Sequence, residues 1–128
     1  MIALTLELLP ETFAVCRLDA PAPIPAWATT AAFFSITRTR AELSLVCAQA
    51  NVPAAIRCER NWRALRVVGQ LDFALTGILA SLAAPLADVG ISIFALSTFD
   101  TDYVLIKQAS LDHAIQVLTR AGHRLASQ

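Results

Sequence analysis

The segment from Thr76 to Phe99 contains only one charged side chain, Asp88, and no other feature constrains the fold as much. A membrane-spanning helix needs about 20 continuous apolar residues. Much of the apolar character here comes from alanine, however, and Pro85, Asp88 and Gly90 interrupt the middle of the segment. We therefore expect no membrane helix, and instead a division of the segment into a helix and a strand.

The apolar spacing predicts a helix in the first part of this segment. Five apolar side chains recur at helical spacing, and Gly90 after them suits a helix C-terminus. The runs ISIFALSTF and DYVLIKQ that follow are rich in β-forming residues and lack this spacing. The predicted helix face consists of Ile78, Leu79, Leu82, Leu86 and Val89.

A second helix is predicted in SLDHAIQVLTRAGH, with Ser110 as its N-cap and Gly122 as its left-handed C-cap. Its apolar stripe consists of Leu111, Ile115 and Leu118. Upstream of both helices, RALRVVG has the composition of a strand. The order is therefore strand, helix, strand, strand, helix, which is most of a ferredoxin-like βαββαβ unit.

The first half of the chain repeats part of this order. Strands are predicted at residues 12–18, 33–39 and 42–48, and a shift of sixty positions places the hairpin of the first half on that of the second. Where the second half has a long helix, the first has the proline-rich DAPAPIPAWATTAA, with room for one helical turn at most. Two unrelated amphipathic hairpins could match in the same way, so both explanations stay open at this point.

Composition limits the classes of function. Hydrophobic residues make up 56% of the 128 residues, above the usual ~45–50%, and the ten basic residues balance the ten acidic ones. A nucleic-acid-binding protein normally has a basic excess, so we expect no nucleic-acid partner. The apolar excess indicates surface that is covered in an oligomer or a ligand cleft, and an oligomer is the favoured explanation.

Catalytic and metal-binding patterns are missing from the sequence. Cys16, Cys47 and Cys58 have no zinc spacing and are expected to be reduced thiols of a cytoplasmic protein. His113 and His123 are expected to be exposed or structural. MIALTLELLPE has no basic segment or cleavage site, so no signal peptide is expected. We therefore predict no catalytic residue, no metal and no cofactor.

The stretch LSTFDTDYVLI is an unusual hairpin link, because it contains neither Gly nor Asn. Asp100 and Asp102 have three interpretations: a solvated turn with local backbone hydrogen bonds, a catalytic acid–base pair, or a ligand site. The residue pattern by itself favours the solvated turn.

Several blocks resemble one known family. CERNWRALRVVGQLDFALTGILASLAAPLADVGISIFALSTFDTDYVLIKQASLDHAI is similar to the C-terminal module of small bacterial ACT-domain proteins related to CASTOR-type arginine sensors. ETFAVCRLDAPAPIPAW and FFSITRTRAELSLVC resemble their reduced first module, so that the resemblance covers about residues 5–123. It implies an α+β fold of two tandem ferredoxin-like (ACT-type) modules with antiparallel sheets, residues 1–60 and 61–128, the first of them reduced.

The resemblance also implies a function and a site. ACT modules are non-catalytic regulatory domains that bind a free amino acid, and they pair their sheets side by side. The hairpin would then line the ligand, with Asp102 contacting its cationic group, and the helix start would receive its carboxylate. Asp100 is expected only to shape the turn. The predicted ligand-binding residues are Thr76, Gly77, Ile78, Thr98, Phe99, Thr101 and Asp102.

The sequence differs from the sensors at one place that affects the identity of the ligand. The sensors have an acidic residue in the loop before the helix, whereas FALTG here is apolar and Asp72 lies two or three residues too early. This leaves arginine and a neutral or smaller amino acid both open as the ligand.

The expected assembly is a homodimer in which the C-terminal modules face each other with the ligand between them, and a further, unidentified protein partner is compatible with a regulatory role. Two alternatives are an adaptor that only oligomerises and a small acid–base enzyme. The dimer contact is expected near Ile78, Leu82, Ile93 and Ala95.

Overall fold

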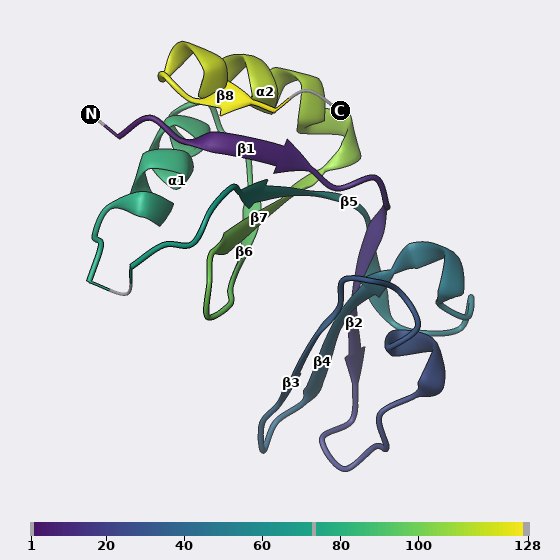
Figure 1. Cartoon of the computed structure of the whole chain (residues 1–128). Coiled ribbons are helices and arrows are strands. Elements are labelled where there is room, and N and C mark those ends of the chain that lie inside the picture. Colours follow the sequence, from purple (N-terminus) through teal and green to yellow (C-terminus); the bar gives the residue numbers. More distant parts are fainter. Residues whose placement is uncertain (1, 73, 127–128) are drawn as a thin grey trace. The chain divides into compact units, whose positions relative to one another are not determined.

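The computed structural model describes residues 2–72 and 74–126 (Figure 1). The chain forms two compact units. The smaller unit is Glu11–Trp62, and the larger unit combines the residues up to Pro10 with those from Arg63 onward. Strand β5, Cys58–Val67, gives its first half to the smaller unit and its second half to the larger one.

The larger unit has the predicted order of strand, helix, strand, strand, helix. After β5 come α1 (Ile78–Asp88), β6 (Ile93–Ser97), β7 (Asp102–Lys107), a 3₁₀ turn at Gln108–Ser110 and α2 (Leu111–Arg120). A short strand β8 (Arg124–Leu125), which the apolar pattern does not reveal, completes the βαββαβ unit. The fold is therefore the mixed α+β, ferredoxin-like architecture that we expected.

An additional strand from the start of the chain enters this sheet. β1 (Thr5–Leu8) runs antiparallel to β5 with Leu6 opposite Val67, and parallel to β8 with Leu6 opposite Leu125. The strand order is β6-β7-β5-β1-β8, and Figure 1 shows β1 lying between β5 and β8. The sequence analysis assigned no strand to these residues, and their pairing partners are about 60 and 120 positions away.

The core of the larger unit lies between its two helices and its sheet. Apolar side chains from β1, β5, β7, α1 and α2 form one buried cluster. Leu82 and Leu86 of the predicted α1 face belong to it, whereas Leu79 and Val89 are exposed. The buried position of Leu82, 1% exposed, contradicts our expectation that this residue lies at a dimer contact. The cluster consists of Leu6, Leu65, Val67, Leu82, Leu86, Ile91, Val104, Ile106, Ala114, Val117 and Leu118.

Both helices end at a glycine with positive φ. The N–H of Gly122 bonds to the carbonyl of Thr119 and that of His123 to Leu118, which is the Schellman arrangement. Gly90 ends α1 in the same way. Ser110 occupies the N-cap position of α2, as predicted, but its side chain forms no capping hydrogen bond.

The smaller unit is a four-stranded antiparallel sheet with very little helix. β2 (Phe13–Leu18), β3 (Ser35–Arg38) and β4 (Leu43–Ala48) are arranged with β5 in the order β3-β4-β2-β5. The proline-rich segment contains only a 3₁₀ turn at Ala26–Ala28, as predicted, and a second 3₁₀ turn occupies Gln49–Asn51. The core of this unit consists of Ala14, Cys16, Ala28, Leu43, Leu45, Cys47 and Val52.

None of the helices in the described part of the chain has both the length and the apolar character required to span a bilayer.

Candidate ligand-binding site

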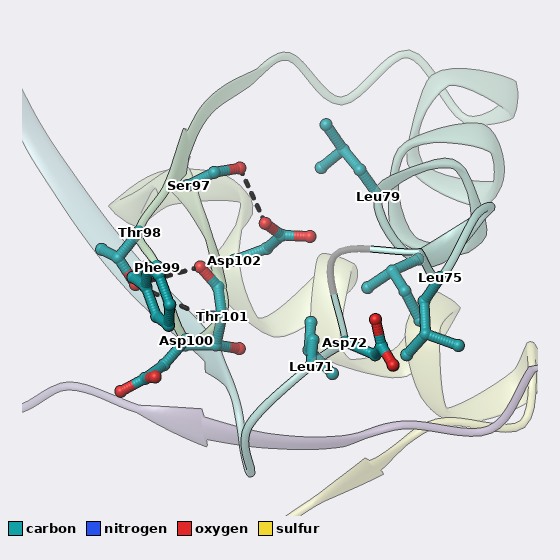
Figure 2. Close-up of a pocket in the computed structure, with 11 residues that line it drawn as sticks. Leu71, Asp72, Leu75, Leu79, Ser97, Thr98, Phe99, Asp100, Thr101 and Asp102 are labelled. Atoms are coloured by element: carbon teal, nitrogen blue, oxygen red, sulfur yellow. Dashed lines mark hydrogen bonds between the residues drawn. The ribbon is translucent and has the colours of Figure 1, made fainter.

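A cavity of about 270 Å³ opens in the larger unit between the β6–β7 hairpin and the segment that leads into α1 (Figure 2). Two continuous pieces of chain supply its walls, and both belong to the same unit. Its lining consists of Leu71, Asp72, Leu75, Ile78, Leu79, Ser97, Thr98, Phe99, Asp100, Thr101 and Asp102.

The Thr98 hydroxyl and a backbone bond close the hairpin, which has no Gly or Asn in its link. Ser97 and Asp102 form the last pair of the β6–β7 ladder, and residues 98–101 link them. The N–H of Thr98 bonds to the carbonyl of Thr101 at 2.9 Å, and the N–H of Thr101 bonds to Oγ1 of Thr98 at 3.3 Å. These side-chain and backbone bonds hold a turn that contains neither Gly nor Asn.

Thr101 fastens this turn to the sheet. Its side chain is 4% exposed, and its hydroxyl donates to the carbonyl of Val67, at the end of β5, over 2.6 Å. The hydroxyl proton is therefore used inside the protein. A ligand that reaches Thr101 would contact its backbone or methyl group.

The two aspartates of the turn have different surroundings. Oγ of Ser97 donates to Oδ1 of half-buried Asp102 over 2.7 Å. Figure 2 shows the Asp102 carboxylate directed toward the side of Leu79, across the cavity, and that of Asp100 directed to the other side of the turn. The backbone carbonyl of Asp100 accepts the N–H of Leu71 over 2.7 Å, which joins the two walls of the cavity.

Asp72 lies in the opposite wall. It lines the cavity although the sequence analysis placed it two or three residues too early for the site. Its Oδ1 accepts the N–H of Ala74 over 2.8 Å, and its carbonyl accepts the N–H of Leu75 over 3.0 Å. These bonds turn the chain, and the turn brings Asp72 to the cavity although four residues separate it from Gly77.

The start of α1 forms part of the same wall. Gly77 is the N-cap, with φ of +81°, and no side chain caps the helix. The first N–H groups of a helix have no intrahelical acceptor, and they form its positive end. A Cβ on Gly77 would lie 3.4 Å from the Ile2 side chain, so there is space for a larger residue at this position. The left-handed φ, which side chains other than that of glycine rarely adopt, is therefore the clearer reason why glycine is found here. Ile78 lines the cavity, while Thr76 and Gly77 are exposed beside it.

The cavity has carboxylates in both of its walls, together with apolar side chains. Three carboxylates, of Asp72, Asp100 and Asp102, are in its lining, and no lysine, arginine or histidine is among the described lining residues. Six lining residues are outside the predicted ligand-binding set: Asp100, which was expected only to shape the turn, and five that sequence reasoning missed. The hairpin register would have identified Ser97, because it is the partner of Asp102; the others are Leu71, Asp72, Leu75 and Leu79.

The histidines are not part of this cavity. His113 is exposed on α2. His123 is 4% exposed and structural: Nδ1 accepts the N–H of Leu4 over 3.1 Å, and Nε2 lies 2.9 Å from the carbonyl of Ser81. Within residues 2–72 and 74–126 no three His, Cys, Asp or Glu side chains are grouped in a way that could hold a metal ion.

Comparison with known families covers both halves of the chain. A family model of the ACT domain matches residues 57–120, half of the chain, and a model of an N-terminal domain matches residues 11–55. The human cytosolic arginine sensor for mTORC1 subunit 1 is 42% identical over 67 residues, which are 52% of this chain and 20% of the sensor. The chain thus spans about a fifth of the length of the curated sensor.

Solved structures extend the similarity to the whole fold. A protein from Agrobacterium tumefaciens superposes with a TM-score of 0.94 at 38% identity, over 100% of this chain and 96% of that one. The regulatory subunit of aspartate kinase from Thermus flavus has a TM-score of 0.65 at 12% identity, over 94% and 99%, and shares the fold. The chain therefore belongs to the ACT-domain family.

Proposed function

We propose that the chain is a non-catalytic regulatory module that binds a free amino acid in the cavity between the β6–β7 hairpin and α1. The observation that carries the proposal is the carboxylate of Asp102, fixed by Ser97 and directed across the cavity. A matched relative is named as an arginine sensor, and a protein with the same fold is named as a regulatory subunit of aspartate kinase. Both names support the regulatory role.

Each part of an amino acid has a counterpart in the cavity. The ammonium group would bind Asp102, because a hydrogen bond to a charged group contributes about 1.5–3 kcal/mol. The carboxylate would approach the N–H groups at Thr76, Gly77 and Ile78, where the helix dipole is positive. Thr98 and Thr101 would lie along the ligand, and Phe99 would cover its side chain.

The position of Asp72 favours a cationic ligand over a neutral one. With Asp72 in the wall, a ligand can place a second positive group opposite the first carboxylate. Arginine and lysine carry such a group, whereas glutamate would add a negative charge to an acidic cavity. We therefore propose a basic amino acid, with arginine as the first candidate.

The assembly is part of the proposal. The smaller unit has the strand order β3-β4-β2-β5 with 3₁₀ turns where helices would be, which supports two tandem ACT-type modules, the first reduced, with a boundary near Arg60. We propose a cytoplasmic homodimer in which the second modules face each other. Ile78, Ile93 and Ala95, which are half-buried or exposed, remain at the proposed contact.

Calorimetric titration tests the ligand proposal. Arginine, lysine, leucine and glutamate would be titrated separately into the wild-type protein and into two matched variants, Asp102→Asn and Asp100→Asn. We expect arginine or lysine to bind, and Asp102→Asn to weaken binding about thirtyfold, or about 2 kcal/mol, with a much smaller effect of Asp100→Asn. Equal losses in both variants would show that the wrong carboxylate has been chosen.

An adaptor without a ligand site is the second candidate. Phe99 is 80% exposed and Leu75 53% exposed at the rim of the cavity, and such apolar side chains also suit a protein contact. A thermal-shift screen of the twenty amino acids separates the two functions. A ligand at a hundredfold excess over its Kd should stabilise the fold by about 2.7 kcal/mol, whereas an adaptor would show no shift with any of them.

A further inference from the structure

The three cysteines gather on one face of the smaller unit, although they lie far apart in the sequence. Cys16 is on β2, Cys47 on β4 and Cys58 on β5, and β2 lies between the other two strands. Cys58 is directly opposite Cys16, and Cys47 is opposite Ala14. Residues two apart in a strand share a face, so all three thiols point to the same side of the sheet.

The ladder geometry brings the Cα atoms of one cysteine pair closest together. The N–H of Arg17 bonds to the carbonyl of Arg57 over 3.0 Å, so these residues form a hydrogen-bonded pair. Hydrogen-bonded and non-hydrogen-bonded pairs alternate in an antiparallel ladder. Cys16 and Cys58 are therefore a non-hydrogen-bonded pair, for which the Cα atoms are about 4.5 Å apart and the side chains are closest.

The Cα spacing of Cys16 and Cys58 is compatible with a disulfide, whereas that of Cys16 and Cys47 is less favourable. A disulfide requires Cα atoms roughly 4.4–6.8 Å apart. The spacing of about 4.5 Å that is typical of a non-hydrogen-bonded pair, such as Cys16 and Cys58, falls within this range. Cys47 is a diagonal neighbour of Cys16, and diagonal positions are about 7–8 Å apart. The backbone therefore favours a bond between Cys16 and Cys58.

Exposure determines which thiol meets a reagent first. Cys16 and Cys47 are 2% and 1% exposed, whereas Cys58 is half-buried and donates to the carbonyl of Ile56 over 3.4 Å. Burial raises the pKa of Cys58; Cys16 and Glu59 raise it further, and Arg60 opposes them. A hydrogen bond with Cys47, together with burial, raises the pKa of Cys16. Cys58 is thus the accessible thiol, and its reactivity increases with pH.

We propose that Cys58 and Cys16 form a reversible cross-strand disulfide by exchange with a small-molecule disulfide such as glutathione disulfide. The Cys58 thiolate attacks one sulfur of the reagent; a mixed disulfide forms, and one glutathione leaves as a thiolate that takes up a proton. Cys16 then loses its proton and attacks the Cys58 sulfur, which releases the second glutathione. The two protein thiols lose two electrons, and the reagent is reduced to two thiols.

The bond would connect β2 to β5 and close a loop through most of the smaller unit. A cross-link of this kind restricts the unfolded chain, so the oxidised protein should unfold at a higher temperature than the reduced one. Cross-strand pairs are also easily reduced when the geometry is strained, which is the property that a reversible switch requires.

The test uses the full-length reduced chain and glutathione disulfide. After incubation, acid quenching and alkylation, mass spectrometry of the intact protein and of its peptides identifies the bonds formed. We expect a Cys16–Cys58 cross-linked peptide that disappears after treatment with a dithiol, and faster formation at pH 9 than at pH 7. Cross-linking of Cys16 to Cys47, or a folded chain that remains fully reduced while the urea-unfolded chain reacts, would overturn the proposal.

Three single variants assign the roles of the thiols. Cys16→Ala should accumulate the mixed disulfide at Cys58, Cys58→Ser should remain unmodified, and Cys47→Ser is the control that should form the cross-link like wild type. Circular dichroism checks that each variant is folded, and the wild-type peptide map decides the pairing even if a core variant does not fold. A Cys58→Ser protein that still forms an intramolecular disulfide would contradict the assignment.

Discussion

Oγ of Ser97 donates a hydrogen bond to Oδ1 of Asp102 over 2.7 Å, across the last pair of the β6–β7 ladder. The two residues are direct neighbours because of the strand register, so the hairpin itself determines where this carboxylate lies. One acceptor oxygen is fixed by the protein, and a carboxylate has further acceptor positions for a ligand. The bond connects the fold of the hairpin to the chemistry of the cavity.

Replacement of Ser97 by alanine should weaken amino-acid binding with little effect on the fold. The change removes one hydrogen bond that orients Asp102, for which about 1 kcal/mol, or a fivefold rise in Kd, is expected. Both residues are at least partly exposed, so the free energy of unfolding should change by less than about 0.5 kcal/mol. Calorimetry and urea unfolding measure the two effects. Ser92→Ala, at an exposed serine one residue before β6, is the control, and an equal loss of affinity in it would argue against an orienting role for Ser97.

Replacement of Thr101 by valine should destabilise the protein, because it removes the donor to the Val67 carbonyl from a site that is 4% exposed. An unsatisfied buried polar group costs about 1–3 kcal/mol. Thr101→Ser keeps the hydroxyl and should lose less stability. Guanidinium unfolding of the two variants measures the difference. If valine and serine cost the same, the bond to Val67 contributes nothing to stability.

The elements of the larger unit could be predicted because their signals are local. Helical spacing identified α1 and α2, and the glycines after them marked the ends of both helices. β-forming runs identified β6 and β7. The short β8 has only two residues, which is too few for any period to be detected.

The features of the fold and of the site that could not be predicted depend on contacts between distant parts of the chain. β1 becomes a strand by pairing with β5 and β8, and the partner of the Thr101 hydroxyl is 34 positions away. Asp72 was judged by its separation along the sequence, but a turn at Ala74 and Leu75 changes its place in space. Such information is absent from residue spacing. The hairpin half of the site was therefore easier to predict than the half before α1.

Replacement of His123 by leucine should destabilise the larger unit. The ring connects the N–H of Leu4 to the carbonyl of Ser81, and leucine leaves both without this partner. A loss of about 2–3 kcal/mol in the free energy of unfolding is expected for the two groups together. His113→Leu is the matched control, because His113 is exposed and should change stability by less than about 0.5 kcal/mol. Similar effects of the two substitutions would contradict a structural role for His123.

Replacement of Leu6 by alanine tests whether the start of the chain belongs to the core of the larger unit. Leu6 is 3% exposed and packs with residues of β5, β7, α1 and α2. Truncation of a buried leucine to alanine costs about 2–5 kcal/mol, because apolar contacts are lost and a cavity remains. Ile24→Ala, at a side chain that is 49% exposed, is the control and should cost much less. Urea unfolding followed by circular dichroism measures both. If Leu6→Ala lowers stability no more than Ile24→Ala, β1 is not an integral strand between β5 and β8. A large loss would instead show that Leu6 of β1 contributes to the core of the larger unit.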